Sequence, residues 1–195
     1  MTPFDQSFLV AIGGSAGSLR AIIDFFDYTP LNNASYVIIR HMPKSHISRL
    51  KEILVKHSKL RIVNVYHSMR LKANTVYIGP CNENLVIEDG QLKLVERKIE
   101  RPNYSVDLFF QSLAKTGIGK RAIAIILSGI GSDGSKGVRY IKEFGGIVIA
   151  QTPGSCQYSS MPESVIKTSF VDFIDLPANI PKIIQQFEFE AKMNR

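Results

Sequence analysis

Hydrophobic residues along the chain form two patterns: short unbroken runs, and stretches in which they recur every three or four positions. The first run, Phe-Leu-Val-Ala-Ile at residues 8–12, ends at Gly13 and Gly14. An unbroken apolar run of this length is typical of a strand that is buried on both faces of a sheet. We therefore predict four buried strands and one shorter strand, at residues 8–12, 36–39, 122–127, 146–150 and 171–174.

Between these runs, the apolar positions have the spacing of helices. Residues 18–27 carry apolar side chains at positions 19, 22, 23 and 26, which form one stripe of an amphipathic helix. The same reasoning predicts further helices over residues 47–54, 106–113, 135–144 and 177–190.

The middle of the chain has a third pattern. Residues 84–88 and 91–95 flank Asp89 and Gly90, a pair that suits the positive φ angles of a type I′ turn and so predicts a β-hairpin. Because strands and helices otherwise alternate, the expected fold class is α/β: a doubly wound, mainly parallel sheet with helices on both faces and one β-hairpin. No linker or repeat divides the chain, so residues 1–195 are expected to form a single domain.

The composition of the 195 residues is that of a soluble globular protein. Hydrophobic residues make up 45% and charged residues 21%, which excludes a disordered, collagenous or coiled-coil chain. No apolar run approaches the ~18 residues of a membrane span, and the first residues lack the features of a signal peptide. Cys81 and Cys156 form neither a CxxC pair nor a disulfide framework. We therefore expect a cytoplasmic protein without membrane insertion.

The charge is unbalanced, with 24 Lys and Arg against 17 Asp and Glu, a net charge of +7. Such a surplus favours an acidic partner, which could be nucleic acid, anionic lipid or an acidic protein surface. We expect no nucleic acid partner, because the basic cluster after residue 41 lacks the interleaved aromatic residues of a single-strand binder. The basic cluster consists of Lys44, Arg49, Lys51, Lys56, Lys59 and Arg61. The sequence also lacks metal-ligand and phosphate-loop motifs, so no metal and no cofactor are expected.

Three of the predicted strands are followed by residues that suit acyl-transfer chemistry. Ser15 follows the first strand, His41 follows the second, and Asp133 lies in the glycine-rich loop after residues 122–127. Ligands of doubly wound sheets bind beyond the carboxyl ends of the strands, so neighbouring strands would bring these side chains together. A histidine can take the proton of a serine near neutral pH, and a carboxylate can orient that histidine. Free N–H groups at the start of the following helix could hold an oxyanion.

Simpler roles fit the same residues. Ser15 could cap the helix that starts near residue 18, Asp133 could cap the helix that follows it, and His41 could be an ordinary loop residue. Residues 129–134 (Gly-Ile-Gly-Ser-Asp-Gly) also match the GxGxxG fingerprint of dinucleotide-binding folds. Against that match, the next strand is followed by Gln151, where a ribose-binding acid is expected, and Asp133 would lie beside the pyrophosphate.

Several separate segments carry a more specific resemblance: residues 12–17 (IGGSAG), 40–43 (RHMP), 76–80 (VYIGP), 105–107 (SVD), 127–134 (LSGIGSDG), and the stretch from 150–151 (AQ) to 160–162 (SMP). Together and in this order, they resemble the catalytic domain of the chemotaxis protein-glutamate methylesterases, the CheB family. The resemblance extends over nearly the whole chain, from about residue 8 to residue 184.

This resemblance implies a function and assigns roles to residues. Ser15 would be the nucleophile, His41 the general base and Asp133 the residue that orients the base, while backbone N–H groups at Ala16 and Ile130 would bind the oxyanion. The reaction would be hydrolysis of glutamate γ-methyl esters on methyl-accepting chemotaxis receptors, which are acidic helical bundles. Deamidation of receptor glutamines would proceed through the same acyl-enzyme, and no cofactor would be needed.

The sequence departs from the family pattern in two respects. Gly17 and Ser18 stand where the family usually has two glycines, and the chain starts almost at the first catalytic strand. Typical members carry an N-terminal receiver domain, and we expect none in this chain. Two alternatives stay open: a serine esterase of the same fold with another substrate, and a non-catalytic module that binds a nucleotide or a partner.

Overall fold

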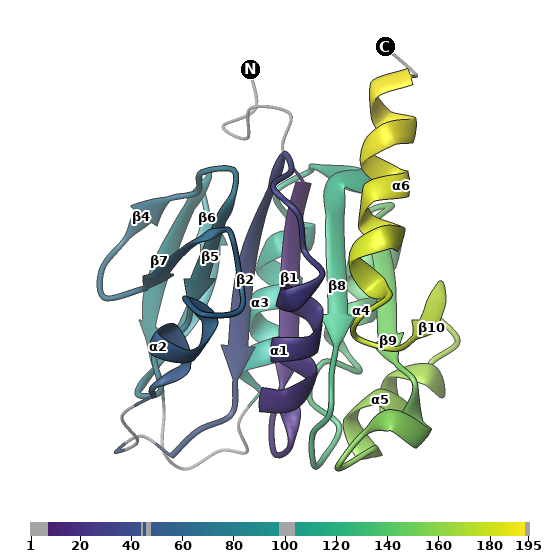
Figure 1. The fold of residues 1–195 in the computed structure, drawn as a ribbon, viewed down its shortest axis with the longest axis horizontal. Helices are drawn as coiled ribbons and strands as arrows, with labels where there is room; N and C mark the ends of the chain where they lie inside the picture. The colour runs from purple at the N-terminus through teal and green to yellow at the C-terminus, as the bar shows by residue number, and fades with distance from the viewer. Residues whose placement is uncertain (1–7, 44, 46–47, 98–103, 194–195) are drawn as a thin grey trace.

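A seven-stranded parallel sheet forms the centre of the computed structural model, which describes residues 8–43, 45, 48–97 and 104–193 (Figure 1). Its strands are β1 (Phe8–Gly14), β2 (Ala34–Arg40), β3 (Arg61–Asn64), β5 (Thr75–Ile78), β8 (Ala122–Ile126), β9 (Ile147–Gln151) and β10 (Phe173–Asp175). Their order across the sheet is β10-β9-β8-β1-β2-β5-β3. The strands β8, β1 and β2 are therefore neighbours, and their carboxyl ends meet at the lower edge of the sheet in Figure 1.

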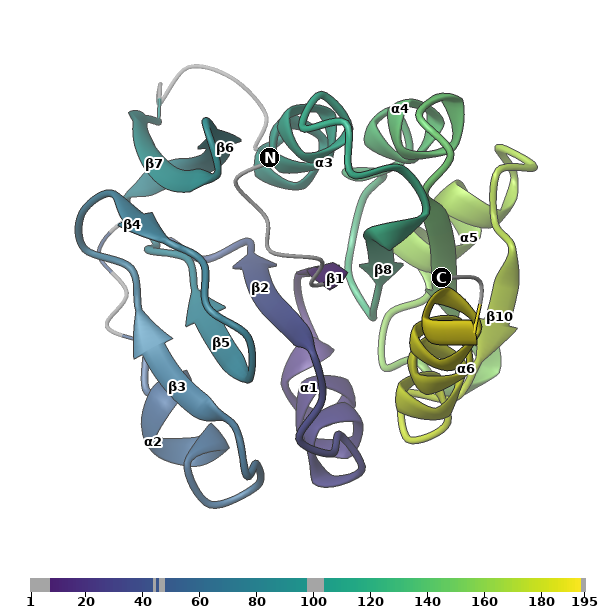
Figure 2. The ribbon, with the colours of Figure 1, turned by 90° about the horizontal axis from the view of Figure 1, so that it is seen from above.

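Helices cover both faces of this sheet (Figure 2). One face packs against α1 (Ser18–Asp27), α2 (Leu50–Leu54) and α6 (Ile180–Met193), and the other packs against α3 (Ser105–Ala114), α4 (Gly137–Glu143) and α5 (Ser160–Ile166). Residues of β1 contribute alternately to the two apolar cores, Leu9 and Ala11 to one and Val10 and Ile12 to the other. This double burial explains why the strand is apolar at every position.

A small antiparallel sheet lies beside α3. Strands β6 (Glu83–Glu88) and β7 (Gln91–Glu96) form a hairpin, and the two-residue strand β4 (Met69–Arg70) pairs with β7. The turn residues Asp89 and Gly90 have φ angles of 50° and 73°, as a type I′ turn requires. The Ile87 N–H donates to the Ser112 hydroxyl of α3 at 3.0 Å, which ties the hairpin to the main layer.

The structure confirms the predicted fold class and the predicted hairpin. The helix predicted from residue 47 begins only at Leu50, and residues 46–47 lie outside the described part of the chain. The helix predicted from residue 177 begins at Ile180 and ends at Met193. The sequence pattern missed the strands β3, β4 and β5, the helix α5 and the two short 3-10 helices at Gly119–Arg121 and Pro153–Ser155. None of the described helices is both long and apolar enough to cross a membrane.

Candidate active site

The ends of β1 and β2 place Ser15 beside His41. The register of the two strands pairs Gly14 with Arg40, so Ser15 and His41 are the next residues on adjacent strands. The His41 N–H donates to the Gly14 carbonyl oxygen at 3.1 Å, and the Ser15 N–H donates to the Ser128 carbonyl oxygen, just after β8, at 3.0 Å. Ser15 is thus flanked by the strand end that carries His41 and by the loop that follows β8.

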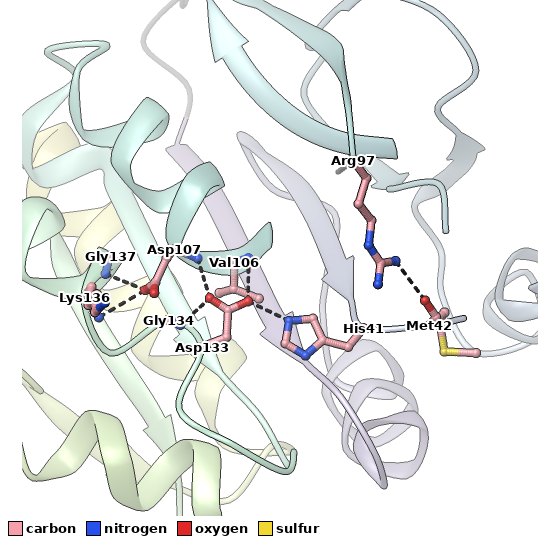
Figure 3. A network of polar contacts seen from close by, with 9 residues as sticks. All are labelled: His41, Met42, Arg97, Val106, Asp107, Asp133, Gly134, Lys136 and Gly137. Carbon is pink, nitrogen blue, oxygen red and sulfur yellow. Dashed lines mark hydrogen bonds and ion pairs between the residues drawn. The ribbon is translucent and has the colours of Figure 1, made fainter. Parts of the chain in front are cut away.

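His41 and Asp133 are in direct contact (Figure 3). The His41 Nε2 atom lies 2.6 Å from Asp133 Oδ2, and the side chains are 16% and 3% exposed, so the carboxylate lies behind the ring. An ionised carboxylate can only accept hydrogen bonds, which makes Nε2 the protonated nitrogen of a neutral ring. The lone pair is then on Nδ1. In the serine protease template the two nitrogens have the opposite roles.

The Asp133 carboxylate is held by the first turn of α3. Its Oδ2 atom accepts from the Val106 N–H, and its Oδ1 atom accepts from the N–H groups of Asp107 and Gly134, each at 2.9 Å. The first N–H groups of a helix lack partners within the helix, and a negative charge there is favourable. The close approach of α3 to β1 requires glycine at Gly13, because a Cβ there would lie 2.5 Å from Val106 Cγ1.

Asp107 is a second carboxylate next to the first, and it is half-buried. Its Oδ1 atom accepts from the N–H groups of Lys136 and Gly137, at 3.0 and 2.7 Å, at the start of α4. Burial, together with the Asp133 carboxylate, raises the pKa of Asp107 to about 6. The amino ends of α3 and α4 thus both hold carboxylates. This arrangement disfavours the dinucleotide interpretation, because a pyrophosphate would need such N–H groups.

The loop after β1 presents Ser15 without using its hydroxyl to cap α1. The residue that precedes α1 is Gly17, with a left-handed φ of 74°, and Ser15 contributes only its carbonyl oxygen, which accepts from the Ser18 hydroxyl at 2.7 Å. Among the described residues, the Ser15 hydroxyl makes no hydrogen bond. Asp133 does not precede α4 directly either, since that position is Lys136.

Two backbone N–H groups near Ser15 have no acceptor within the described part of the chain. They belong to Ala16 and to Ile130. Gly129, which precedes Ile130, packs against the serine, because a Cβ on Gly129 would lie 3.0 Å from Ser15 Cβ. Ile130 is itself 57% exposed. Unpaired N–H groups next to a serine hydroxyl have the chemistry of an oxyanion site.

The described His, Cys, Asp and Glu side chains form no group of three or more that could hold a metal ion.

Two residues that position the site were not assigned a role from the sequence. Ser128 is buried, and its hydroxyl oxygen lies 3.1 Å from the carbonyl oxygens of Ala16 and Tyr158. Asp107 bridges α3 and α4 as described above. The signal for Ser128 was its place directly after a buried strand, whereas the contacts of Asp107 depend on tertiary packing.

Comparison with known proteins identifies the family. A family model described as CheB methylesterase matches residues 10–184. The chain belongs to the CheB methylesterase family. The crystal structure of the CheB methylesterase catalytic domain from Thermotoga maritima is similar to it, with a TM-score of 0.82 and 28% identity, over 93% of this chain and 98% of that one.

Curated relatives of this CheB-family chain include two proteins named protein-glutamate methylesterase/protein-glutamine glutaminase. The protein from Desulfitobacterium hafniense is 33% identical over 81% of this chain and 42% of its own length, and that from Photorhabdus laumondii is 30% identical over 84% and 48%. An uncharacterized 104.1 kDa protein from Rhodobacter capsulatus is 37% identical over 63% of this chain and 13% of its own length. The chain therefore spans about half, or less, of these relatives.

Proposed function

We propose that the chain is a serine hydrolase that demethylates glutamate γ-methyl esters on chemoreceptors and deamidates receptor glutamines. The triad would consist of Ser15, His41 and Asp133. The observation that carries the proposal is the partly buried contact of 2.6 Å between His41 and Asp133, at the strand end next to Ser15, in a member of the CheB family. The names of the relatives from Desulfitobacterium hafniense and Photorhabdus laumondii contain both activities.

The geometry suggests which atoms act in the reaction. The Ser15 hydroxyl oxygen attacks the ester carbonyl carbon, and His41 Nδ1 takes the hydroxyl proton. The N–H groups of Ala16 and Ile130 stabilise the oxyanion of the tetrahedral intermediate. The same proton leaves with the methoxy group as methanol, and water then hydrolyses the acyl-enzyme to glutamate and free serine. A glutamine substrate follows the same course, with ammonia in place of methanol.

The test is the release of methanol from methylated chemoreceptor by the wild type and by Ser15→Ala. The substitution is expected to lower kcat by about 10⁴–10⁶-fold, as in other triads, and to leave folding intact because removal of one hydroxyl opens almost no cavity. Ser68→Ala, at an exposed position, is the matched control and should retain the wild-type rate. Near-normal turnover by a folded Ser15→Ala protein would rule out the proposed mechanism.

A further inference from the structure

Arg97 joins two loops at the edge of the sheet where Ser15 and His41 lie. It directly follows β7, and its Nη1 atom donates to the carbonyl oxygens of Met42 and Cys81 at 3.0 and 2.9 Å. Met42 belongs to the loop after β2, and Cys81 to the loop after β5, the strand next to β2 in the sheet. The residue directly after the small antiparallel sheet thus links two loops of the parallel sheet; Figure 3 shows its contact with Met42.

The link lies one residue after His41. On its other sides, His41 is held by its own N–H, which donates to Gly14, and by its ring, which contacts Asp133. Because β2 stops at Arg40, the peptide that follows His41 lies outside the strand and outside its regular hydrogen-bond pairing. A hydrogen bond from a guanidinium to a carbonyl is charge-assisted and roughly twice as strong as a neutral one. Arg97 therefore fixes the Met42 peptide, which sets the direction in which the chain leaves His41.

We propose that Arg97 is a positioning residue for His41, and that it holds the loop after β2 so that the imidazole can contact both Asp133 and Ser15. The inference rests on the proposed function, since it concerns the step in which His41 takes the proton of Ser15. Arg97 does not touch the substrate in this proposal. Its effect is exerted through the Met42 carbonyl and the His41 backbone.

A purely structural link would behave differently from a positioning residue. If Arg97 only fastened the small sheet to the large one, its loss would lower the melting temperature and leave the chemistry of the folded protein unchanged. If it positions His41, its loss lowers kcat in the folded protein, while KM stays nearly constant because the residues that bind substrate are still in place. The reactivity of Ser15 itself would fall in parallel.

The experiment compares Arg97→Met, which keeps a long apolar stem without a donor, with Arg97→Lys. Both hydrogen bonds come from one nitrogen, so a lysine ammonium group has the donors to replace them. Arg70→Met is the matched control, because Arg70 belongs to the same small sheet and is exposed. For each variant, kcat and KM are measured on methylated chemoreceptor, the rate of Ser15 labelling is measured with a fluorophosphonate probe, and the melting temperature is recorded.

Arg97→Met is expected to lower both kcat and the labelling rate by about 10- to 100-fold, the loss typical of a misplaced catalytic group. Arg97→Lys should restore most of that loss, and Arg70→Met should match the wild type. Equal labelling rates and kcat values for Arg97→Met and the wild type would overturn the inference and leave the proposed function standing. A wild type that neither reacts with the probe nor releases methanol would overturn both.

If Arg97→Met does not fold, Arg97→Gln is measured in its place. The glutamine amide retains a donor but is shorter and uncharged, so it should also reduce kcat and the labelling rate in a folded protein. A folded Arg97→Gln protein with the wild-type kcat and labelling rate would overturn the inference equally.

Discussion

At the scale of the residue, the contact between His41 and Asp133 determines which ring nitrogen faces the serine. The Asp133 carboxylate accepts from the imidazole and from three backbone N–H groups. An asparagine has an NH2 donor in place of one acceptor oxygen. If that group replaces Oδ1, the N–H groups of Asp107 and Gly134 lose their acceptor; if it replaces Oδ2, the Val106 N–H loses its acceptor and Nε2 must itself become an acceptor. The latter puts the proton on Nδ1, where it blocks proton transfer from Ser15. We predict a loss of kcat of about 10²–10⁴-fold with the fold preserved.

The kcat values of His41→Ala and of the double variant Ser15→Ala/His41→Ala are measured together with that of Asp133→Asn. His41→Ala should lose about as much kcat as Ser15→Ala, and the double variant should lose little more, because members of a triad act as one unit. The readout is methanol release from methylated receptor at one fixed pH. Multiplicative losses in the double variant, or a wild-type rate for folded Asp133→Asn, would contradict a shared role.

The sequence allowed these three residues to be found because each follows a buried strand within a few positions. Ser15 and His41 come directly after apolar runs, and the order of the strands then brings their ends together. Arg97 could not be found in this way. Its acceptors are Met42 and Cys81, which are distant in sequence, and both are backbone carbonyls that leave no signal in residue type.

At the scale of the element, Asp107 connects the starts of α3 and α4 and makes the stability of the fold depend on pH. Its pKa is raised from 3.8 to about 6, mainly by burial, so the folded state binds a proton more tightly than the unfolded state. The contribution of Asp107 to the free energy of unfolding is then fully present below pH 3.8 and is lost as the pH rises through 6. Asp107→Asn removes this titration and keeps an oxygen to accept from Lys136 and Gly137.

The free energy of unfolding of Asp107→Asn minus that of the wild type is therefore expected to be larger at pH 7.5 than at pH 4.5, which means that the variant gains stability relative to the wild type as the pH rises. Urea denaturation at the two pH values measures this difference directly. The prediction fails if the gap between the two proteins is the same at both pH values, or if it is larger at pH 4.5.

The elements predicted from the sequence are those with long or regular hydrophobic patterns. The buried strands β1, β2, β8 and β9 consist of apolar runs because helices cover both of their sides. β3 and β5 have only four residues each, and β3 begins with the exposed Arg61, so neither reaches the length at which a pattern is distinctive. In α5 the third residue is Pro162, which is compatible with a first helical turn but hides the helix from pattern analysis.

At the scale of the whole molecule, the net charge of +7 should draw the protein to an acidic chemoreceptor. We expect the basic residues that follow His41 to dock the receptor, namely Lys44, Arg49 and Lys51. Arg49 and Lys51 are exposed at the start of α2, and Lys44 lies outside the described residues. Surface charges act over a Debye length of about 8 Å at physiological salt, so the attraction should weaken as salt is added.

Replacing these three residues with glutamine should raise KM for methylated receptor at low salt and leave kcat for a small soluble ester unchanged, because charges at the rim of an interface affect encounter more than chemistry. The matched control replaces Lys115, Lys120 and Lys192, which are exposed, lie outside the basic cluster and belong to segments near the opposite edge of the sheet. Since both variants lose three positive charges, a general effect of net charge would raise KM equally in both. A docking role instead predicts a rise confined to the first variant, which disappears at high salt. Equal KM values for the first variant and the wild type at low salt would show that Lys44, Arg49 and Lys51 do not dock the receptor.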